Sequence, residues 1–498
     1  MTAPLICVCA LLVAAKLGIF APAAADDRPN VILMLSDDWG YGDVGVYGGP
    51  HYPRSGTKVR TPNIDTMARE GVIFTDYHTA NPVCSPSRAA LMTGLFPARV
   101  GIHTALNSNA EANKKEGQVN FLNLSVPTVT EHFQKAGYLV GHYGKWHLGG
   151  TKTPPSPAPT SYGIDSAVTF NSNDPAHQLG NESAPYWAGV SSSLIIDNAI
   201  KLISEATAQK KPFYLNLWFH IAHAKLDPTP EQLSAFTAEC SQEEKAVNQT
   251  YCPGQIYWAS QTDTDTQIGR LMAALKQQGL YNNTLSVFTA DNGPEDVMVY
   301  HNAQGTTGPW RGRKRSLYEG GHRVPFIGHW PARISAGRVD HSILGGADWF
   351  PTAAQMAGIP LSSGDLQKID GEDMSAAFLN GKGSAPESRE KMLFWEWRFN
   401  VAGHCWNQAP HLAVRNGTWK FMMNSDGTRH ELYEMGNEPG KTQHFELKNV
   451  AAANADIVAS LSIALSDWLK TLPKGPKFTP NNFGCGTSHM PVIHDPAN

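Results

Sequence analysis

The chain has 498 residues, and its composition is that of a globular protein with many turns. Glycine and proline make up about 16% of it, above the usual share of about 12%, and hydrophobic residues at 41% are enough for a core, which excludes disorder for the bulk of the chain. The net charge is −4, from 44 acidic and 40 basic residues, and no basic stripe is present, so nucleic-acid binding is not expected. The length predicts two or more domains, or one large domain with an appendage.

The N-terminus has the pattern of an export signal. Leu5 to Ala15 is apolar, and Ala23 to Ala25 before Asp26 resemble a cleavage site. No Lys or Arg precedes the apolar run and Lys16 interrupts it, so an N-terminal membrane anchor is the alternative. No other segment approaches the roughly 18 apolar residues of a membrane-spanning helix. We expect a signal peptide over residues 1–25 and a mature protein that is exported, periplasmic or secreted, without a stable membrane span.

The predicted elements after the signal alternate between strands and helices. Asn30 to Ser36 is a near-continuous apolar run, typical of a parallel strand buried on both faces. Thr61-Pro62 opens a helix that ends at Gly71, because Thr caps helices and Pro suits their first turn. The following elements are a strand (72–77), two helices (86–93, 127–136), a strand (138–142), a helix (193–209), a strand (212–219), a long helix (256–278) and a strand (285–289). This order predicts an α/β fold with a large, mostly parallel sheet between helices.

From about Lys391 the pattern changes to short strands joined in part by hairpin turns. Asn416-Gly417 and Asp426-Gly427 are the turns, and the final helix is amphipathic. The predicted strands are 392–397, 411–414, 419–423 and 430–433, and the helix is 453–472. A Gly/Ser/Pro-rich stretch at 381–388 separates this part from the rest. We therefore predict an α/β domain over residues 26–388 and a smaller domain of antiparallel sheet plus helix over residues 389–498.

Polar residues follow two of the predicted buried strands. Asp37-Asp38 comes after the first strand, and Asp291-Asn292 comes after the strand at 285–289. Ligands of open α/β sheets lie beyond the carboxyl ends of the strands. Three carboxylates and an amide oxygen form a hard ligand set that favours Ca²⁺ or Mg²⁺ over Zn²⁺. The alternative is that each pair is a helix cap or a solvated turn.

The segment from Cys84 to Gly94 is the most specific local signal. Cys84 precedes a predicted helix start, where backbone N–H groups and the helix dipole favour an anion. Arg88 lies one turn on and adds a fork for sulfate or phosphate oxygens. A lone cysteine at a helix start is usually a small buried residue, but here the whole pattern C-x-P-S-R-x-x-L-x-T-G is present.

The cysteine count also singles out Cys84. The chain contains Cys7, Cys9, Cys84, Cys240, Cys252, Cys405 and Cys485. The first two would leave with the signal, and the remaining odd number in an oxidising compartment implies one unpaired or altered thiol. The other four allow three pairings, of which we predict Cys240–Cys252 and Cys405–Cys485. The second bond would close a loop of about 80 residues and hold His404 near the mouth of the active site.

Together with further motifs, these residues resemble the formylglycine-dependent (type I) sulfatases of the alkaline-phosphatase superfamily. The resemblance extends from about residue 28 to 470 and includes Asn30–Gly42, Thr61–Asp65, the Cys84 signature, Gly144–Gly149, Asp291–Gly293 and Glu319–Pro325. Ala80 to Val83 and the overall layout most resemble the N-acetylgalactosamine-6-sulfatase and arylsulfatase A branch. The resemblance implies hydrolysis of aryl or carbohydrate sulfates, with N-acetylgalactosamine 6-sulfate among the candidate substrates.

The resemblance also implies a modified nucleophile and one metal ion. A formylglycine-generating enzyme, the expected partner for maturation, would oxidise Cys84 to Cα-formylglycine, whose hydrate attacks sulfur. The expected cation is Ca²⁺, with Mg²⁺ as the alternative, and its implied ligands are Asp37, Asp38, residue 84, Asp291 and Asn292.

The remaining roles follow the family's motifs. Asp291 would take the proton of the attacking hydroxyl, Arg88 and Lys145 would stabilise the hydrate and the sulfate charge, and His147 would take the proton of the second hydroxyl. His223 and Lys314 would stabilise or protonate the leaving oxygen.

Two of these assignments have competitors in the sequence. His220 competes with His223, because the family's proline two residues after the histidine is Lys225 here, and Arg313 competes with Lys314. Two other functions also fit the motifs: a phosphate or phosphonate ester hydrolase of the same superfamily, and a non-catalytic exported sugar-binding protein.

Overall fold

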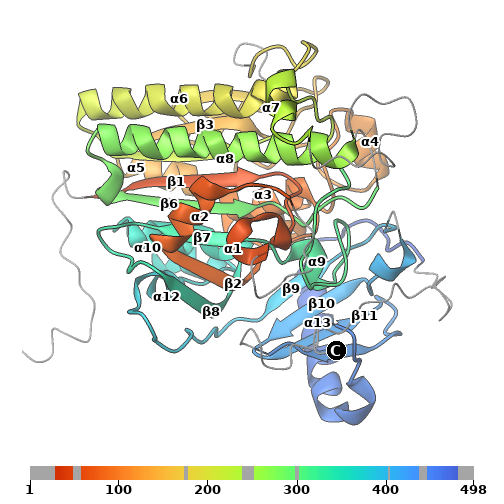
Figure 1. Ribbon diagram of the computed structural model, residues 1–498. Helices are drawn as coiled ribbons and strands as arrows, with labels where there is room; N and C mark the ends of the chain where they lie inside the picture. The colour runs from red at the N-terminus through yellow and green to blue at the C-terminus, as the bar shows by residue number, and fades with distance from the viewer. Residues whose placement is uncertain are drawn as a thin grey trace, which may run out of the picture.

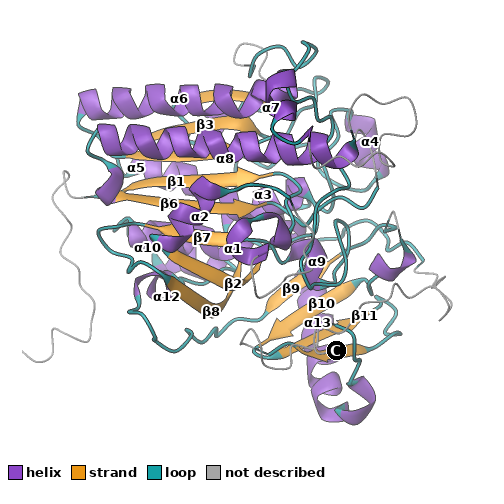
Figure 2. Cartoon of the chain, viewed as in Figure 1, coloured by secondary structure: helices purple, strands orange, loops and turns teal. Residues whose placement is uncertain are grey.

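The protein contains one large sheet between helices and one small sheet beside it (Figures 1 and 2). The computed structural model describes residues 28–48, 58–172, 178–237, 252–297, 302–401, 404–436 and 446–480. The predicted signal peptide and the two cysteines at 240 and 485 lie outside these residues. The boundary predicted at 388/389 falls between the last helix of the large part and the first strand of the small sheet, and it stays a prediction.

The large sheet has eight strands in the described residues, in the order β4-β3-β5-β1-β6-β7-β2-β8. All neighbouring strands are parallel except β7, which is antiparallel to both β6 and β2. In sheet order the strands are β4 (Ser166–Phe170), β3 (Leu139–Lys145), β5 (Phe213–Trp218), β1 (Asn30–Ser36), β6 (Thr284–Ala290), β7 (Phe326–His329), β2 (Val72–His78) and β8 (Arg338–Gly345). The central strands β1, β5 and β6 are buried along their whole length, as their apolar sequences predict.

Helices cover both faces of this sheet (Figure 1). The long helices α6 and α8 lie side by side over one face, and α3, α5 and α10 pack together on the other. The helices are α1 (Gly45–Gly48), α2 (Pro62–Arg69), α3 (Cys84–Thr93), α4 (Ala110–Lys115), α5 (Val129–Lys135), α6 (Trp187–Gln209), α7 (Pro230–Ser234), α8 (Pro253–Gln277), α9 (Glu319–His322), α10 (Trp349–Met356), α11 (Ser363–Lys368), α12 (Ser375–Leu379) and α13 (Ala455–Thr471). In the described part of the chain, none of these helices has both the length and the apolar character that crossing a bilayer requires.

The predicted α/β sandwich is confirmed, but three strands of the large sheet were not predicted. β4 is a half-buried edge strand, β7 has four residues, and β8 alternates in burial, so none of them forms a long apolar run. Several predicted elements are longer than expected; for example, β3 runs on to Lys145, and α6 begins at Trp187.

The small sheet is antiparallel, as predicted, with the strand order β12-β11-β10-β9. Its strands are β9 (Leu393–Glu396), β10 (Leu412–Asn416), β11 (Trp419–Met423) and β12 (Glu431–Glu434). The predicted turn is present, since Asn416 pairs with Trp419 and Gly417 has a φ of +54°, a conformation that favours glycine. Helix α13 packs on β10 and β11 through Leu461, Leu465 and Trp468.

Buried ion pairs join the small sheet to the large one. Arg415 on β10 lies 3.1 Å from Asp76 on β2, and Arg323 after α9 lies 3.1 Å from the same carboxylate. Lys420 on β11 donates a hydrogen bond of 2.8 Å to Glu319 on α9. Each of these side chains is buried, and burying an unpaired charge costs several kcal/mol. The two sheets are therefore held in one relative position by charge pairing as well as by apolar contact.

Replacing Lys420 with methionine should destabilise the protein by about 3–5 kcal/mol, because Glu446 would stay buried without the cation it pairs with and Glu319 would keep only Arg323, 2.9 Å away. Burial by itself raises the pKa of Glu319, but Lys420 and its neighbours hold that pKa well below the ordinary value. In the native protein this carboxylate therefore stabilises the fold at neutral pH, and its contribution is lost as the pH falls through the folded-state pKa.

Burial already raises the pKa of Glu446 to about 7, and without Lys420 that pKa rises further, so the variant loses stability as the pH rises from 5 to 7.5. Thermal denaturation should then show a larger deficit at pH 7.5 than at pH 5. Lys470→Met, on the exposed face of α13, is the matched control and should change the midpoint little. Equal midpoints for the wild type and Lys420→Met at pH 7.5 would show that the ion pairs do not stabilise the interface.

Candidate active site

Seven of the eight described strands of the large sheet run in one direction, and five of them are followed by polar side chains at the same edge. β3, β5, β1 and β6 are parallel neighbours, and β2 shares their direction because the antiparallel strand β7 lies between β6 and β2. The carboxyl ends of parallel strands are where open α/β sheets bind ligands. The polar side chains that follow these five strands form the candidate site.

Asp37 and Asp291 occupy equivalent positions after β1 and β6. The register pairs Ser36 with Ala290, the last residues of the two strands, so the residues that follow them are neighbours. The backbone N–H of Asp38 donates to Oδ1 of Asp291 at 3.2 Å. Four buried side chains each place a potential ligand atom within 4.8 Å of the others: Asp37, Asp38, Cys84 and Asp291.

Each of the three carboxylates has a buried cation beside it. The pairs are Arg88 with Asp291, at 2.6 Å, Lys145 with Asp37, and Lys314 with Asp38, at 2.7 Å. Arg88 comes from α3, Lys145 is the last residue of β3, and Lys314 lies in the loop between β6 and α9. Three positive and three negative charges balance, so a divalent cation added here would leave the centre positive and suited to an anion.

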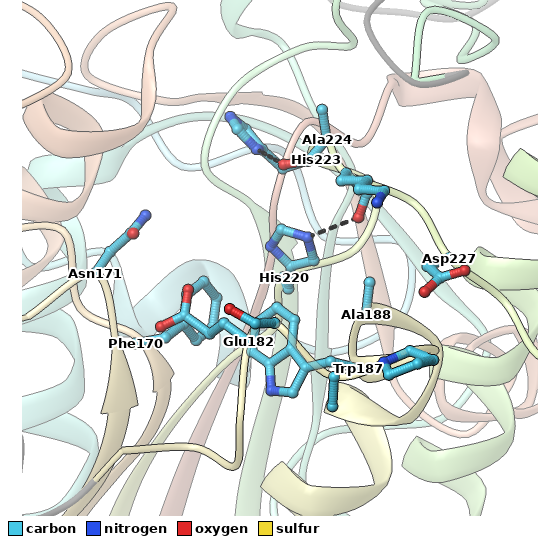
Figure 3. Close-up of a pocket in the computed structure, with 13 residues that line it drawn as sticks. Phe170, Asn171, Glu182, Trp187, Ala188, His220, His223, Ala224 and Asp227 are labelled. Carbon is cyan, nitrogen blue, oxygen red and sulfur yellow. Dashed lines mark hydrogen bonds between the residues drawn. The ribbon is translucent and has the colours of Figure 1, made fainter.

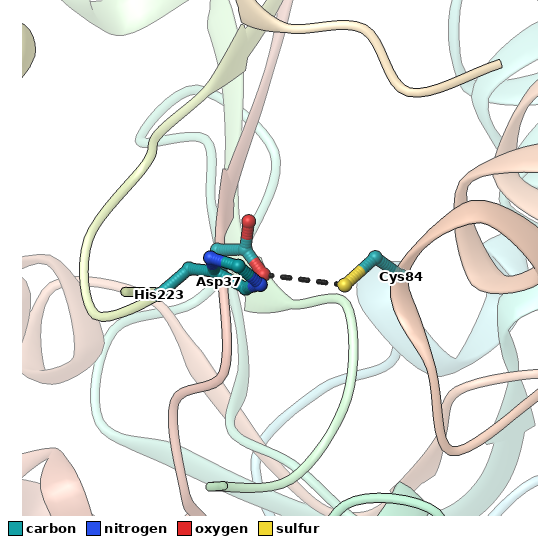
Figure 4. A group of neighbouring side chains, drawn as sticks. All are labelled: Asp37, Cys84 and His223. Carbon is teal, nitrogen blue, oxygen red and sulfur yellow. Dashed lines mark hydrogen bonds between the residues drawn. The ribbon is translucent and has the colours of Figure 1, made fainter. Parts of the chain in front are cut away.

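Cys84 points into this cluster (Figure 4). Its Sγ donates to Oδ1 of Asp37 at 3.5 Å, and a ring nitrogen of His223 lies within 4.8 Å of both groups. Helix α3 begins at Cys84 and not at Pro86, so the cysteine is the first helical residue instead of preceding the helix. The difference has a simple reason, since proline is tolerated anywhere in the first turn, where its missing N–H has no partner in the helix.

Burial and charge shift the ionisation of the cluster in opposite directions. Burial alone would raise the pKa of Asp37, but Lys145, His223 and Arg88 outweigh it and hold that pKa well below its ordinary value. Burial and the charge of Asp37 raise the pKa of Asp291 to about 6. Burial, with Asp37 again, raises the pKa of the Cys84 thiol, so the thiol is neutral at physiological pH.

The residues present fit a divalent metal ion. The amide nitrogen of Asn292 donates to Asp38 Oδ1 at 2.7 Å and to the carbonyl of Gly293 at 2.8 Å, whereas its buried Oδ1 has no partner among the described residues. A buried acceptor without a partner costs about 1–3 kcal/mol, and a cation would satisfy it. With the three carboxylates, this oxygen completes an all-oxygen donor set of the kind that Ca²⁺ and Mg²⁺ prefer.

His147 is a neutral imidazole with one free nitrogen at the edge of the cluster. Its Nε2 lies 2.9 Å from the carbonyl of Leu106, to which it must donate, and its buried Nδ1 has no partner among the described residues. Burial, together with Lys145 and Arg88, keeps the pKa of His147 well below its ordinary value. Both His147 and Asp38 have left-handed backbones, with φ of 55° and 57°, a strained conformation that is frequent at functional sites.

The structure places one histidine and one lysine in the cluster and their competitors outside it. His223 lies beside Cys84 and Asp37, whereas Nε2 of His220 donates to the carbonyl of Lys225 at 3.2 Å. Lys314 lies beside Asp38, whereas Arg313 donates to the carbonyls of Glu295 and Gly305.

One acidic residue of the site was missed in the sequence. Glu295 lies 3.5 Å from Lys314 and 2.5 Å from Arg315, and these cations lower its pKa to about 2 despite burial. It thereby fixes the loop that carries Lys314. The sequence did contain a signal for it, because Glu295 follows Asp291 by four residues. A second acidic residue near the end of the same strand needs a cation close by.

Two further cysteines are disulfide-bonded, Cys252 and Cys405, and Cys84 is the free cysteine of the described residues. The pairings with Cys240 and Cys485 stay predictions, because those two lie outside the described part of the chain. The backbone N–H of His404 donates to Asp296 at 2.7 Å, so the connection between β9 and β10 reaches the loop that carries Lys314.

Known proteins resemble this chain over almost its whole length. The sulfatase family model matches residues 29–359, and the model for the C-terminal part of N-sulphoglucosamine sulphohydrolase matches residues 310–470. Arylsulfatase A of Homo sapiens is 30% identical over 495 residues, which cover 89% of this chain and 88% of that protein. N-acetylgalactosamine-6-sulfatase of Canis lupus familiaris is 31% identical over 510 residues, covering 93% and 90%.

Solved structures share the fold. The PsFucS1 sulfatase from Pseudoalteromonas sp. superposes with a TM-score of 0.68 at 23% identity, covering 92% of this chain and 93% of that one. Ps i-CgsB gives a TM-score of 0.70 at 24% identity, covering 89% and 92%. Sequence identities this low show only that the fold is shared, whereas the sequence matches above identify the family. The chain belongs to the sulfatase family of the alkaline-phosphatase superfamily and is a sulfuric ester hydrolase.

Proposed function

We propose that this protein hydrolyses sulfate esters of saccharides or aryl alcohols with a Cα-formylglycine made from Cys84 and one divalent cation. The observation that carries the proposal is the position of Cys84: its Sγ is 3.5 Å from Asp37, within a buried group of three carboxylates and three cations. An ordinary structural cysteine has no need of such surroundings.

Asp37, Asp38, Asp291 and Asn292 would hold the cation, with residue 84 beside it. When present, the cation supplies positive charge that polarises a sulfate oxygen, and the hydrated formylglycine supplies the hydroxyl that attacks sulfur. Ca²⁺ is proposed over Mg²⁺, because Mg²⁺ usually keeps several waters whereas this donor set is buried and comes entirely from the protein.

The chain's own cations would neutralise the sulfate. Arg88 and Lys145 are fully paired and buried, so they are already oriented and need no rearrangement when charge develops on the sulfate oxygens. Asp291 would accept the proton of the attacking hydroxyl, and Lys314 would donate to the leaving oxygen.

The two histidines would have different roles in proton transfer. Nδ1 of His147 is the free acceptor that would take the proton of the second hydroxyl, because Nε2 is held by Leu106. Nδ1 of His223 is 2.6 Å from the carbonyl of Ala224 and must donate to it, which leaves Nε2 as an acceptor. His223 would therefore protonate a leaving oxygen only after gaining a proton, and Lys314 is the first donor.

Carbohydrate sulfates are the proposed natural substrates. The relatives include enzymes named for N-acetylgalactosamine 6-sulfate, and one structure of the same fold was solved with its substrate D-glucosamine-2-N,6-O-disulfate. We further propose that the protein is exported to the periplasm or secreted. We also propose that a formylglycine-generating enzyme matures it, since a cysteine thiol carries no hydroxyl, whereas hydrated formylglycine carries the two that the reaction needs.

Mass spectrometry of the peptide that contains Cys84 tests the proposal together with activity. Conversion to formylglycine lowers the peptide mass by about 18 Da. Protein made with a formylglycine-generating enzyme should show this shift and hydrolyse 4-nitrophenyl sulfate, and protein with an intact Cys84 should not. Parallel assays on 4-nitrophenyl phosphate and phosphonate esters address the alternative hydrolase, and a higher kcat/KM on either than on the sulfate would overturn sulfate as the substrate class.

A further inference from the structure

A pocket of about 630 Å³ opens beside the proposed nucleophile (Figure 3). It lies between the segment that follows β4 and the segment that follows β5, and the start of α6 closes one side. His223 belongs both to this pocket and to the group around Cys84. A substrate whose sulfate reaches residue 84 would therefore place its neighbouring atoms in this pocket.

Aromatic rings form one wall. The ring centroids of Phe170 and Trp187 are 5.2 Å apart, and His220 lies 5.3 Å from Trp187 and 5.4 Å from Phe170. This cluster is rigid, since Nε1 of Trp187 donates to the carbonyl of Leu179 and Nε2 of His220 donates to Lys225. A fixed apolar wall with a few polar groups suits the C–H face of a sugar ring.

The polar groups around this wall are mainly hydrogen-bond acceptors. Glu182 and Asp227 contribute carboxylates, and Asp227 is held by the N–H of Tyr186 at 2.5 Å. Because Nε2 of His220 is a donor, its Nδ1 carries a lone pair, and this buried atom has no partner among the described residues. Sugar hydroxyls would donate to such acceptors, whereas a sulfate or carboxylate group would offer them only further acceptors.

The formal charge of the pocket also favours an uncharged group over an anionic one. Of its lining residues, two are acidic and one, Lys225, is basic, so the formal charge is negative with neutral histidines. The centre around Cys84 is balanced and becomes positive with a divalent cation. The site is thus built for one anionic group at the centre and an uncharged group beside it.

We infer that the pocket binds an uncharged, hydroxyl-bearing sugar residue that carries the reacting sulfate, and that Glu182 and Asp227 discriminate against a second sulfate or a carboxylate on that sugar. The inference rests on the proposed sulfatase function and names its substrate class: saccharides sulfated once on a neutral sugar.

The test compares singly and doubly charged substrates. Galactose and N-acetylgalactosamine bearing one sulfate at position 3, 4 or 6 are assayed against the same sugars bearing two sulfates, with 4-nitrophenyl sulfate as the reference. The wild type should have the higher kcat/KM on monosulfates. Both Glu182→Gln and Glu182→Lys should lower the ratio of mono- to disulfate kcat/KM, by roughly three- to tenfold, with the larger effect for Glu182→Lys. Added salt should reduce the difference between the variants and the wild type. Glu205→Gln is the matched control, because it is an exposed glutamate near the other end of α6, about 27 Å from Trp187.

Two results would overturn the inference without touching the proposed function: a wild type that hydrolyses 4-nitrophenyl sulfate but prefers disulfates, or a Glu182→Lys variant whose ratio equals that of Glu205→Gln. Formylglycine-containing protein that hydrolyses neither the aryl sulfate nor any sugar sulfate would refute the proposed function and, with it, the inference.

Discussion

Replacing Cys84 with alanine should lower kcat on 4-nitrophenyl sulfate by about 10⁴-fold or more, because the variant lacks the covalent nucleophile. The fold should survive, since only one small buried atom is removed from the start of α3. Cys84→Ser should be impaired as severely, because serine carries one hydroxyl and its sulfate ester has no second hydroxyl to expel the sulfate. Both variants are compared with the wild type by steady-state kinetics and thermal denaturation.

Thr93→Ala is the matched control for these variants. Thr93 lies at the other end of the same helix, and its hydroxyl donates to the carbonyl of Ala89. Its loss should cost some stability while kcat per folded molecule stays near the wild-type value. A Cys84→Ala protein with wild-type kcat would refute a nucleophile at position 84.

Removing the divalent cation should inactivate the protein, and restoring it should recover activity. Without the cation, Asn292 Oδ1 has no partner among the described residues. The three positive and three negative side chains then cancel in charge, so the site has no net positive charge to bind sulfate. We expect elemental analysis to find about one Ca²⁺ per chain, chelation to abolish turnover, and Ca²⁺ to restore it better than Mg²⁺. Asp38→Asn keeps the shape of the side chain but removes one charged ligand, so cation affinity and kcat should fall together, by roughly two orders of magnitude.

Asp197→Asn makes the same chemical change on the exposed surface of α6, where Asp197 pairs with Arg270. It should bind the cation and turn over as the wild type does. If exhaustively chelated protein contains no metal and keeps full activity, the proposed cation site is wrong.

Much of this protein can be predicted from its sequence because the informative signals are local. The apolar run from Asn30 to Ser36 predicts a central buried strand, and the polar residues after it predict a ligand site, since strand ends are where such sheets bind ligands. The motif from Cys84 to Gly94 lies in one helix, where backbone N–H groups and Arg88 necessarily face the same region. The hairpins of the small sheet are equally local, because Asn416-Gly417 specifies its own turn.

Contacts between distant parts of the chain decided the rest. Asp38 and Asn292 meet only because β1 and β6 pair in register, and the contact of Lys314 with Asp38, which Arg313 does not make, depends on the folded chain. No local pattern predicts β7, a strand of four residues whose place depends on its neighbours β6 and β2. The pocket that holds Glu182 and His220 likewise exists only between two loops from separate strands. The sequence by itself determined the fold class, because that depends on periodicity, and it predicted residue 84 as the nucleophile and oxygen ligands for a cation from local motifs and their resemblance to a family. Tertiary structure alone decided which cation meets which carboxylate and what charge the substrate pocket carries, because these depend on the three-dimensional positions of side chains far apart in the chain.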